Sequence, residues 1–230
     1  MATECRVFKA VHPSTPVVVW GYPARVQPDL ADFGRRSDVL FVGNLSTPPN
    51  ADAVHQLLTD IFPRIRRELD ARLFVVGATP TADALDAALA QTESVVLTGF
   101  VNDLAPVFAT RRVFVAPHRF AAGIPIKVIE AMSHGVPCVV SPLLAEQLEL
   151  TDGVEALVGE NAADFAGKVV RLYRDRDVWN QIQQQALRWL RERSDPAAMQ
   201  AQLGQWIEEA IARKRGRAPK TIARPEVESI

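Results

Sequence analysis

Short apolar runs alternate along the chain with longer segments of helical periodicity. Each run is continuous, without polar residues at every second position, which is typical of strands buried on both faces of a parallel sheet. The segment from Ala51 to about Leu69 repeats apolar residues at steps of three and four and predicts a helix with one core-facing stripe. The runs that predict strands are Val17–Trp20, Val39–Val42, Leu73–Val76, Val95–Leu97, Val113–Ala116 and Cys138–Val140.

Residues that favour helix ends mark several of the intervening segments. Thr81 and Asp103 are good N-caps, and Pro125 and Gly135 flank the segment 126–134 as a helix start and stop. After Ser141 only one short apolar piece, Glu155–Val158, precedes a mostly helical region. The further predicted helices are Thr81–Ala90, Asp103–Ala109, Ile126–His134, Asn161–Arg174, Val178–Arg191 and Pro196–Ala212.

This order of elements predicts an α/β fold. Strands and helices that alternate on this spacing form an open, doubly wound, Rossmann-like parallel sheet, here with a helical C-terminal cover. We expect three parts in the 230 residues. Residues 1–34 form an irregular linker with a short strand, residues 35–213 the Rossmann-like domain, and residues 214–230 a basic tail that we expect to be mobile.

Composition excludes several classes of protein. The 26 Lys+Arg nearly balance 27 Asp+Glu, so no overall field attracts nucleic acid. No apolar run approaches the roughly 20 residues of a membrane-spanning helix. The first ten residues lack the apolar core of a signal peptide, so we expect a cytoplasmic protein. Two cysteines, Cys5 and Cys138, provide neither a disulfide framework nor a zinc site.

The C-terminal tail carries the one surplus of positive charge. Between Ile211 and Ile230 six basic residues face two acidic ones, a net charge of 6 − 2 = +4. A solvated tail explains this charge. The alternative is docking to an anionic inner membrane leaflet, worth about 1 kcal/mol per basic residue near the surface.

Candidate chemistry lies in the loops after the strands, because open parallel sheets bind ligands at the carboxyl ends of their strands. Gly43 and Asn44 follow the strand 39–42 and lead to a helix whose N-terminus favours an anion. An ordinary turn with an Asn cap is the alternative. Neither a dinucleotide-binding Gly-x-Gly-x-x-Gly nor a P-loop is present.

The segment 113–140 is the most informative. Lys127 and Glu130 are three residues apart at the start of the predicted helix 126–134, so they share one of its faces. The first-turn amides, the helix dipole and Lys127 favour a phosphate, and the Glu130 carboxylate can accept hydrogen bonds from sugar hydroxyls. A clamp for a nucleotide sugar and a surface ion pair both fit this spacing.

This segment resembles the donor-site signature of glycosyltransferase family 4. It reads Gly123-Ile-Pro-Ile-Lys127-Val-Ile-Glu130-Ala-Met-Ser-His-Gly135-Val-Pro137, matching the family's Gly-x-x-x-Lys-x-x-Glu-Ala-Met-x-x-Gly-x-Pro pattern. Further motifs agree in order and spacing, and the resemblance extends from about Val17 to Arg191. They are Phe41-Val-Gly43-Asn44-Leu with Pro49-Asn50, Leu73-Phe-Val-Val-Gly77, and Leu97-Thr-Gly99-Phe100-Val101.

The resemblance implies the donor-binding half of a GT-B enzyme, in which two Rossmann-like domains enclose the active site. Such enzymes transfer a sugar from a nucleoside-diphosphate sugar to a glycan or lipid-linked acceptor, usually with retention and without a metal ion. Their catalysis is electrostatic, since a fixed positive potential stabilises the departing diphosphate. A bacterial role in surface-polysaccharide or glycolipid assembly is the expectation.

The resemblance also assigns roles to residues of this chain. Lys127 and Glu130 are the catalytic candidates, with Lys127 near the diphosphate and Glu130 on the ribose hydroxyls. The remaining candidates bind substrate: the Gly43–Asn44 loop at the phosphate end, the backbone of Phe100 and Val101 at the base, Arg119 in the loop, and the amides of Gly123, Ile124 and Ile126 at the diphosphate.

Two departures from the family pattern change the expectation. Ala122 stands where the family's Glu-x7-Glu pattern has its first Glu. Pro125 stands where a basic residue is common just before the Lys, and Arg119 could compensate for that missing charge from the loop. The length fits one half of a GT-B enzyme, so we expect an N-terminal domain as a partner. A nucleotide-sugar epimerase of this architecture and a non-catalytic binding module remain alternatives.

Histidine and tryptophan side chains offer further candidates. His134 falls at the end of a predicted helix, where its charge suits the dipole, and we expect a structural role. His118 lies in the ligand loop, and both a structural and a ligand-binding role fit it. We expect Trp179, Trp189 and Trp206, all on predicted C-terminal helices, to anchor packing rather than to stack on a base.

Overall fold

One parallel β-sheet of six strands organises the computed structural model, which describes residues 2–18, 20–78 and 94–215. The strand order is β3-β2-β1-β4-β5-β6, and every neighbouring pair is parallel. This confirms the doubly wound, Rossmann-like fold. The strands are β1 (Ser37–Val42), β2 (Leu73–Val76), β3 (Val95–Gly99), β4 (Arg111–Ala116), β5 (Cys138–Val140) and β6 (Leu157–Val158).

The strands are apolar throughout because both faces of the sheet are covered. Successive side chains of a strand point to opposite faces. In β1, Val39 and Phe41 therefore join one core cluster and Leu40 joins the other, and all three are fully buried. Continuous apolar runs without alternation are the sequence signature of this arrangement.

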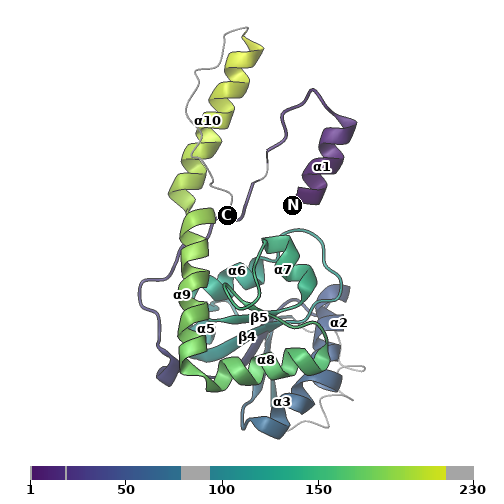
Figure 1. The fold of residues 1–230 in the computed structure, drawn as a ribbon, viewed down its shortest axis with the longest axis vertical. Coiled ribbons are helices and arrows are strands. Elements are labelled where there is room, and N and C mark those ends of the chain that lie inside the picture. The colour runs from purple at the N-terminus through teal and green to yellow at the C-terminus, as the bar shows by residue number, and fades with distance from the viewer. Residues whose placement is uncertain (1, 19, 79–93, 216–230) are drawn as a thin grey trace.

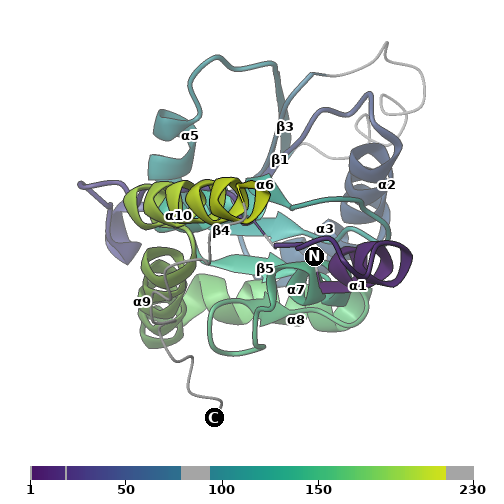
Figure 2. The ribbon, with the colours of Figure 1, turned by 90° about the horizontal axis from the view of Figure 1, so that it is seen from above.

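Helices form a layer on each face of the sheet (Figures 1 and 2). α2, η2, α3 and α8 pack on one face, α5, α6 and α7 on the other, and α9 contributes to both clusters. In the described part of the chain the helices are α1 (Ala2–Val11), η1 (Phe33–Arg35), α2 (Pro48–Gln56), η2 (Leu57–Ile61), α3 (Phe62–Glu68), α5 (Ala105–Thr110), α6 (Ile126–Ser133), α7 (Pro142–Leu148), α8 (Ala162–Arg174), α9 (Arg176–Arg193) and α10 (Pro196–Lys214).

The long helix expected from Ala51 to Leu69 is present but contains a π turn. Its middle segment, η2, widens so that the Phe62 N–H donates to Leu57 O. Pro63 explains the change, because a proline lacks an N–H and its ring clashes with the carbonyl four residues earlier. The apolar stripe survives the turn: Leu57, Ile61 and Ile65 are all fully buried.

The N-terminal segment differs from the expectation. Residues 17, 18 and 20 of the predicted strand Val17–Trp20 belong to none of the strands described, because the sheet begins at Ser37 and offers them no neighbour. Instead α1 precedes an extended segment that docks through Tyr22, Ala24 and Val26 onto the second core cluster. Backbone bonds from Ala24 N to Ser194 O (2.8 Å) and from Gln27 N to Ser133 O (3.0 Å) hold it there.

Helix α7 is an element that the periodicity did not predict. Ser141 is its N-cap, with its hydroxyl accepting from Leu144 N, and Pro142 occupies the first turn. A Ser-Pro pair before an apolar segment is a helix-start signal.

The predicted helix Thr81–Ala90 and the tail 216–230 lie outside the described residues, and the three-part division of the chain stays a prediction.

The C-terminal helices form the expected cover. Trp179 and Trp189 are buried, and Trp179 donates its indole N–H to Arg112 O at 2.8 Å, so both are packing anchors as expected. Trp206 on α10 meets Trp20 edge-to-face at 5.5 Å between ring centroids. α10 extends from the end of α9 away from the sheet layers (Figure 1). None of the helices in residues 2–18, 20–78 and 94–215 is long and apolar enough to cross a bilayer.

A buried arginine ties the start of β1 to the helices around it. The Arg36 guanidinium donates to Ala31 O, Phe108 O and His134 O, each at 2.8 Å, and to Arg111 O at 3.2 Å. Its side chain is almost fully buried. These carbonyls lie before β1, at the ends of α5 and α6 and at the start of β4, so one side chain satisfies four otherwise separate backbone groups.

Replacing Arg36 by Lys will destabilise the protein. A single ammonium cannot reach carbonyls spread over four segments, and the carbonyls it leaves unpaired cost about 2–4 kcal/mol. Urea unfolding followed by circular dichroism measures the loss. Arg35→Lys, at the exposed neighbouring position, is the matched control and will change stability little. Equal stabilities for the two variants would contradict this role of Arg36.

The carboxyl ends of β1, β2 and β3 are packed backbone to backbone. Gly77 N donates to Gly99 O and Gly43 N donates to Val76 O, each at 2.9 Å. Gly77 has φ +144°, and a Cβ at this position would stand 2.0 Å from Gly43 O. Only glycine permits this approach, which brings the loop after β1 against the loop after β2.

Gly77→Ala will therefore be strongly destabilising. The added Cβ meets backbone rather than a flexible side chain, and the φ angle is strained for any other residue, so we expect a loss of about 3 kcal/mol. Thermal and urea unfolding provide the measurement. Gly167→Ala on α8, where a Cβ meets open space, will be neutral or stabilising. A Gly77→Ala protein as stable as this control would show that the loops separate freely.

Candidate functional site

The candidate site lies where the sheet reverses its winding. β1 and β4 are neighbours in the sheet, yet the helix that follows β1 and the helix that follows β4 pack on opposite faces (Figure 2). The loops after these two strands therefore diverge and leave room between them. Ligands of open α/β sheets bind at such a position, outside the carboxyl ends of the strands.

The loop after β1 is organised around Gly43 and Asn50. A Cβ on residue 43 would stand 2.8 Å from Asn50 Cγ, so Gly43 makes room for the Asn50 side chain. Asn44 caps the turn, its Oδ1 accepting from Ser46 N at 2.9 Å. Gly43 was expected to let a ligand approach the backbone closely, but the Asn50 side chain fills that space.

The start of α2 does not provide the expected anion site. Pro48 and Pro49 have no N–H, and the N–H groups of Asn50 and Ala51 already donate to Thr47 O, at 3.1 and 3.0 Å. The dipole of this helix remains, but these residues leave no free first-turn donor for a phosphate.

Lys127 lies in the first turn of α6 and reaches across to the loop after β1. Its ammonium donates to Asn50 Oδ1, lies 3.1 Å from His118 Nε2, and stands 5.2 Å from the centre of the Phe41 ring. Burial lowers the pKa of Lys127 to about 8. Because this value is above 7, the side chain carries most of its positive charge at neutral pH.

His118 is a buried member of the same cluster. It is 2% exposed, stacks on Phe41 with 5.7 Å between ring centroids, and places Nε2 3.0 Å from Asn50 Oδ1. Burial first, and then the charge of Lys127, lower its pKa to about 4. The imidazole is therefore neutral at physiological pH, and His118 contacts Asn50 and Lys127 without adding a charge to the cluster.

Glu130 lies one turn after Lys127 on α6 and is half-buried. Burial raises the pKa of its carboxyl above the usual value. No hydrogen bond or ion pair engages this carboxylate in the part of the chain that the structure describes, whereas Lys127 is held on both sides. Its acceptor oxygens are free for donors such as hydroxyl groups.

Arg119 is paired rather than free. Its guanidinium forms a two-point ion pair with Asp52 of α2, with Nε to Oδ2 at 3.0 Å and a second hydrogen bond from Nη2 to Oδ1. This pairing lowers the pKa of Asp52. Arg119 therefore links the loop after β4 to α2, and its charge is partly neutralised before any ligand arrives.

The loop before α6 offers fewer amides than expected. Ile126 N donates to Ile124 O at 2.8 Å, and Pro125 has no N–H. Gly123 N and Ile124 N have no hydrogen-bond partner among residues 2–18, 20–78 and 94–215. Gly123 adopts φ +77°, and Ile124 packs on the second core cluster. The amides of Gly123 and Ile124, but not that of Ile126, are available to a ligand.

Phe100 and Val101 follow β3, further along the same edge. Phe100 is 74% exposed, and Val101 packs against the second core cluster. The bond from Gly77 N to Gly99 O, at 2.9 Å, connects this loop through β2 to the loop after β1. No contact given for these two residues reaches Lys127 or Glu130, so the structure places them on the same edge without joining them to the cluster.

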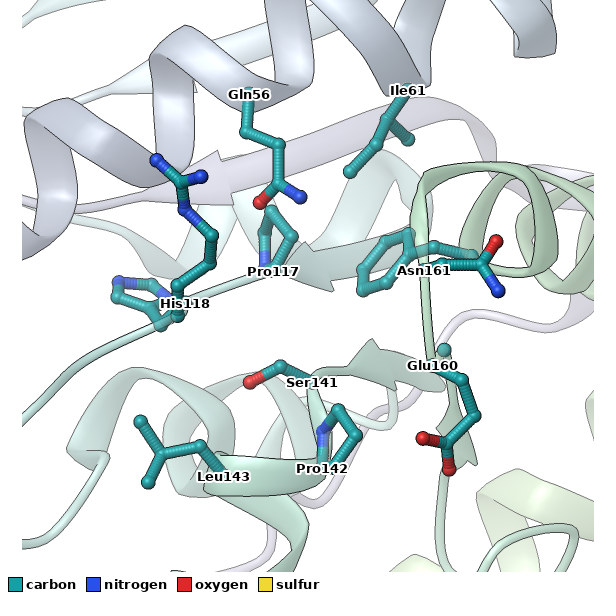
Figure 3. Close-up of a pocket in the computed structure, with 12 residues that line it drawn as sticks. Gln56, Ile61, Pro117, His118, Ser141, Pro142, Leu143, Glu160 and Asn161 are labelled. Atoms are coloured by element: carbon teal, nitrogen blue, oxygen red, sulfur yellow. The ribbon is translucent and has the colours of Figure 1, made fainter.

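A cavity of about 330 Å³ adjoins the cluster (Figure 3). It lies at the ends of β4, β5 and β6, and Gln56 of α2 and Ser141 at the start of α7 line it from different sides. His118 and Arg119 belong to its wall, but Lys127, Glu130, Gly43 and Gly123 do not. The cavity is therefore beside the predicted site rather than part of it.

Sequence reasoning missed the residues that assemble the cluster. The sequence offers Asn50 only as part of a motif with Pro49, gives no signal for Asp52, and leaves the role of His118 open. Asn50 next to two prolines at a helix start was the available signal, yet nothing in the sequence places it against Lys127, which is 77 residues away. His134, as expected, is structural: it stacks on Phe108 with 4.9 Å between ring centroids.

Comparison with solved structures supports the same fold. The chain resembles a mutant of S. aureus TarM in complex with fondaparinux, α-GlcNAc-glycerol and UDP (12% identity, TM-score 0.74), with 90% of this chain and 42% of TarM covered. It resembles the pneumococcal O-GlcNAc transferase GtfA in complex with UDP and GlcNAc (12%, 0.70), with 92% and 44% covered. It also resembles Anabaena HepE in complex with UDP and glucose (16%, 0.65), with 77% and 49% covered.

The chain thus spans less than half of each of these three structures. Comparison with curated sequences finds no match. The family model described as glycosyl transferases group 1 matches residues 36–175, which is more than half of the chain and includes β1 through α8. The chain belongs to the family of group 1 glycosyl transferases, and its fold is of the GT-B type.

Proposed function

We propose that this chain is the donor-binding half of a retaining glycosyltransferase that uses a nucleoside-diphosphate sugar. The observation that carries the proposal is the pairing, one turn apart on α6, of a half-buried lysine cation with an unengaged carboxylate at the switch point of the sheet. Lys127 receives the diphosphate, and Glu130 accepts hydrogen bonds from the ribose hydroxyls. These two residues are the catalytic and donor-binding centre.

The neighbouring loops complete the donor site. The Gly43–Asn44 loop borders the phosphate end, and the amides of Gly123 and Ile124 donate to phosphate oxygens. The backbone at Phe100 and Val101 meets the base. Arg119 and Ile126 border the proposed donor site. Arg119 is held there by its ion pair with Asp52, and Ile126 presents a partly exposed side chain.

The proposed chemistry is electrostatic. The bond between the anomeric carbon of the donor sugar and the diphosphate oxygen breaks, and a bond from that carbon to an acceptor hydroxyl oxygen forms, while the hydroxyl proton leaves with the diphosphate. Negative charge grows on the diphosphate during this step. The Lys127 ammonium, fixed in a partly dry setting, stabilises that charge without needing to reorganise.

We further propose that an N-terminal GT-B domain supplies most of the contacts to the glycan or lipid-linked acceptor. This chain covers less than half of each of the three proteins similar in fold, which were solved with UDP or sugars, and this supports a two-part enzyme of this type. The basic tail, residues 214–230, would hold such an enzyme at the inner face of the cytoplasmic membrane of a bacterium, where lipid-linked acceptors are made.

Nucleotide binding tests the donor site directly. Isothermal titration with UDP, GDP and ADP will detect binding of at least one of them, and Glu130→Gln will weaken that nucleotide about tenfold because two ribose contacts lose their anionic acceptor. Inorganic pyrophosphate lacks a ribose, so Glu130→Gln will leave its affinity unchanged, whereas Lys127→Ala will weaken both ligands. Glu192→Gln, on the exposed surface of α9, is the control. Absence of binding by all three nucleotides would refute the proposed function.

The charge of Lys127 makes binding dependent on pH. With a pKa of about 8 in the free protein, the lysine is mostly charged at pH 7 and mostly neutral at pH 9, so nucleoside-diphosphate affinity will fall roughly tenfold between them. His118, with a pKa of about 4, stays neutral over this range and contributes nothing to the slope. Titration calorimetry at constant ionic strength measures the profile.

Lys127→Arg is the control for this profile. Arginine stays charged throughout the range, so its affinity will be nearly constant from pH 7 to pH 9 even if the absolute value is lower. A wild-type affinity that does not change over this range, or an equal fall in Lys127→Arg, would show that Lys127 is not the cation that binds the diphosphate.

A further inference from the structure

The orientation of the Asn50 amide is determined by its surroundings. Its nitrogen Nδ2 lies 2.8 Å from Asn44 O and 2.9 Å from Thr47 Oγ1. Thr47 Oγ1 gives its own proton to Asn44 O at 2.9 Å, so it can only accept from Asn50. Both neighbours of this end of the amide are acceptors, and the amide oxygen must therefore face the other way.

The amide oxygen of Asn50 faces two side chains from different elements. It accepts a hydrogen bond from Lys127 Nζ of α6 and lies 3.0 Å from Nε2 of His118 in the loop after β4. Lys127 Nζ and His118 Nε2 are themselves 3.1 Å apart. An ammonium has three N–H groups. With Nε2 of the neutral His118 ring unprotonated, Asn50 Oδ1 and His118 Nε2 each accept one of these N–H groups, and the third remains for a ligand.

The packing around this triad leaves it little freedom. Phe41 at the end of β1 lies beneath both partners, stacked on His118 and 5.2 Å from Lys127 Nζ. Gly43 leaves the space that the Asn50 amide fills. Asn50 therefore contacts Lys127 within a packed arrangement, while its other end holds Asn44 and Thr47 of the same turn.

The charged groups near Lys127 are few. Glu130 shares its helix, one turn on. Asp52 of α2 acts on His118 but is paired with Arg119 of the loop after β4. His118 itself is neutral at physiological pH, and β1 contributes the uncharged Phe41. Asn50 and the neutral His118 are thus the two groups of the described site within hydrogen-bond distance of the Lys127 ammonium, and neither brings a charge.

We propose that Asn50 is a positioning residue that holds the Lys127 ammonium in its charged form and directs its free N–H toward the diphosphate of the donor. The proposal rests on the proposed function for the ligand, but its effect on Lys127 does not need the ligand. Through its second end Asn50 also connects Lys127 to the Asn44 carbonyl, so the loops after β1 and β4 and the start of α6 form one unit.

Two substitutions at Asn50 will move the titration of Lys127 in opposite directions. Asn50→Leu keeps the approximate shape but removes the acceptor, so the pKa of Lys127 will fall because burial is no longer offset by a hydrogen bond to the charged form. Asn50→Asp adds a negative charge at the same place, so the pKa will rise. Asn180→Leu and Asn180→Asp on α9 are the matched controls, because Asn180 is far from the site in sequence and has no side-chain hydrogen bond among the described contacts.

The measurement is made first on the ligand-free protein. Nuclear magnetic resonance of ¹³C-labelled lysine follows the ε-carbon of Lys127 with pH. The sequence has five lysines, and Lys127→Arg identifies the signal by its loss. Opposite shifts in the two Asn50 variants, with none in the Asn180 variants, support the proposal. A Lys127 titration that is unchanged in both Asn50 variants, in proteins that keep the wild-type spectrum elsewhere, overturns it.

Binding of UDP then tests the consequence for the ligand. Asn50→Leu will lower UDP affinity about tenfold at pH 7, which corresponds to ~1.4 kcal/mol, and will move the alkaline fall in affinity to lower pH. Asn50→Asp will also weaken UDP but will move the fall to higher pH. A purely structural role would weaken binding equally at every pH. If no nucleotide binds the wild-type protein, the proposed function fails, while the lysine titration still decides the role of Asn50.

Discussion

The central strand β1 is hydrogen-bonded in parallel to β2 on one side and to β4 on the other, and both the core and the site depend on this pairing. Parallel pairing aligns the carboxyl ends of the strands at one edge. It also requires crossover helices on both faces, which is why the strands are apolar on both sides. Because winding reverses between β1 and β4, the loops after them separate, and Lys127 and Asn50 approach across that gap.

The site obtains its positive potential locally. The whole sequence is nearly neutral, and Arg119, the exposed cation next to the site, is paired with Asp52. Lys127 is the half-buried cation of the described site, and a charge in a partly dry setting acts more strongly on a ligand than one in water. Such a residue must be supported by a neutral acceptor, since a paired carboxylate would cancel the field that a diphosphate needs. Asn50 meets that requirement.

Local pattern predicted most of the fold. The five expected strands from residue 39 onward are all present, and α6 has Pro125 and Gly135 at its ends as expected. Prediction failed where pairing decides structure: residues 17, 18 and 20 are as apolar as a strand but have no neighbour in the sheet. It also failed at the start of α2, where the sequence indicates a helix N-terminus but hydrogen bonding within the turn consumes its donors.

Sequence by itself determined the fold class, the family and the identity of the two side chains, Lys127 and Glu130, whose spacing on one helix is a local property. Only the tertiary structure decided how those side chains are held. Asn50, His118 and Lys127 come from three elements, and Arg119, next to His118, is paired with Asp52 of α2, the helix that also carries Asn50. Contacts between distant segments follow from strand order and packing, not from periodicity, and burial that lowers the pKa of Lys127 exists only once those segments have met.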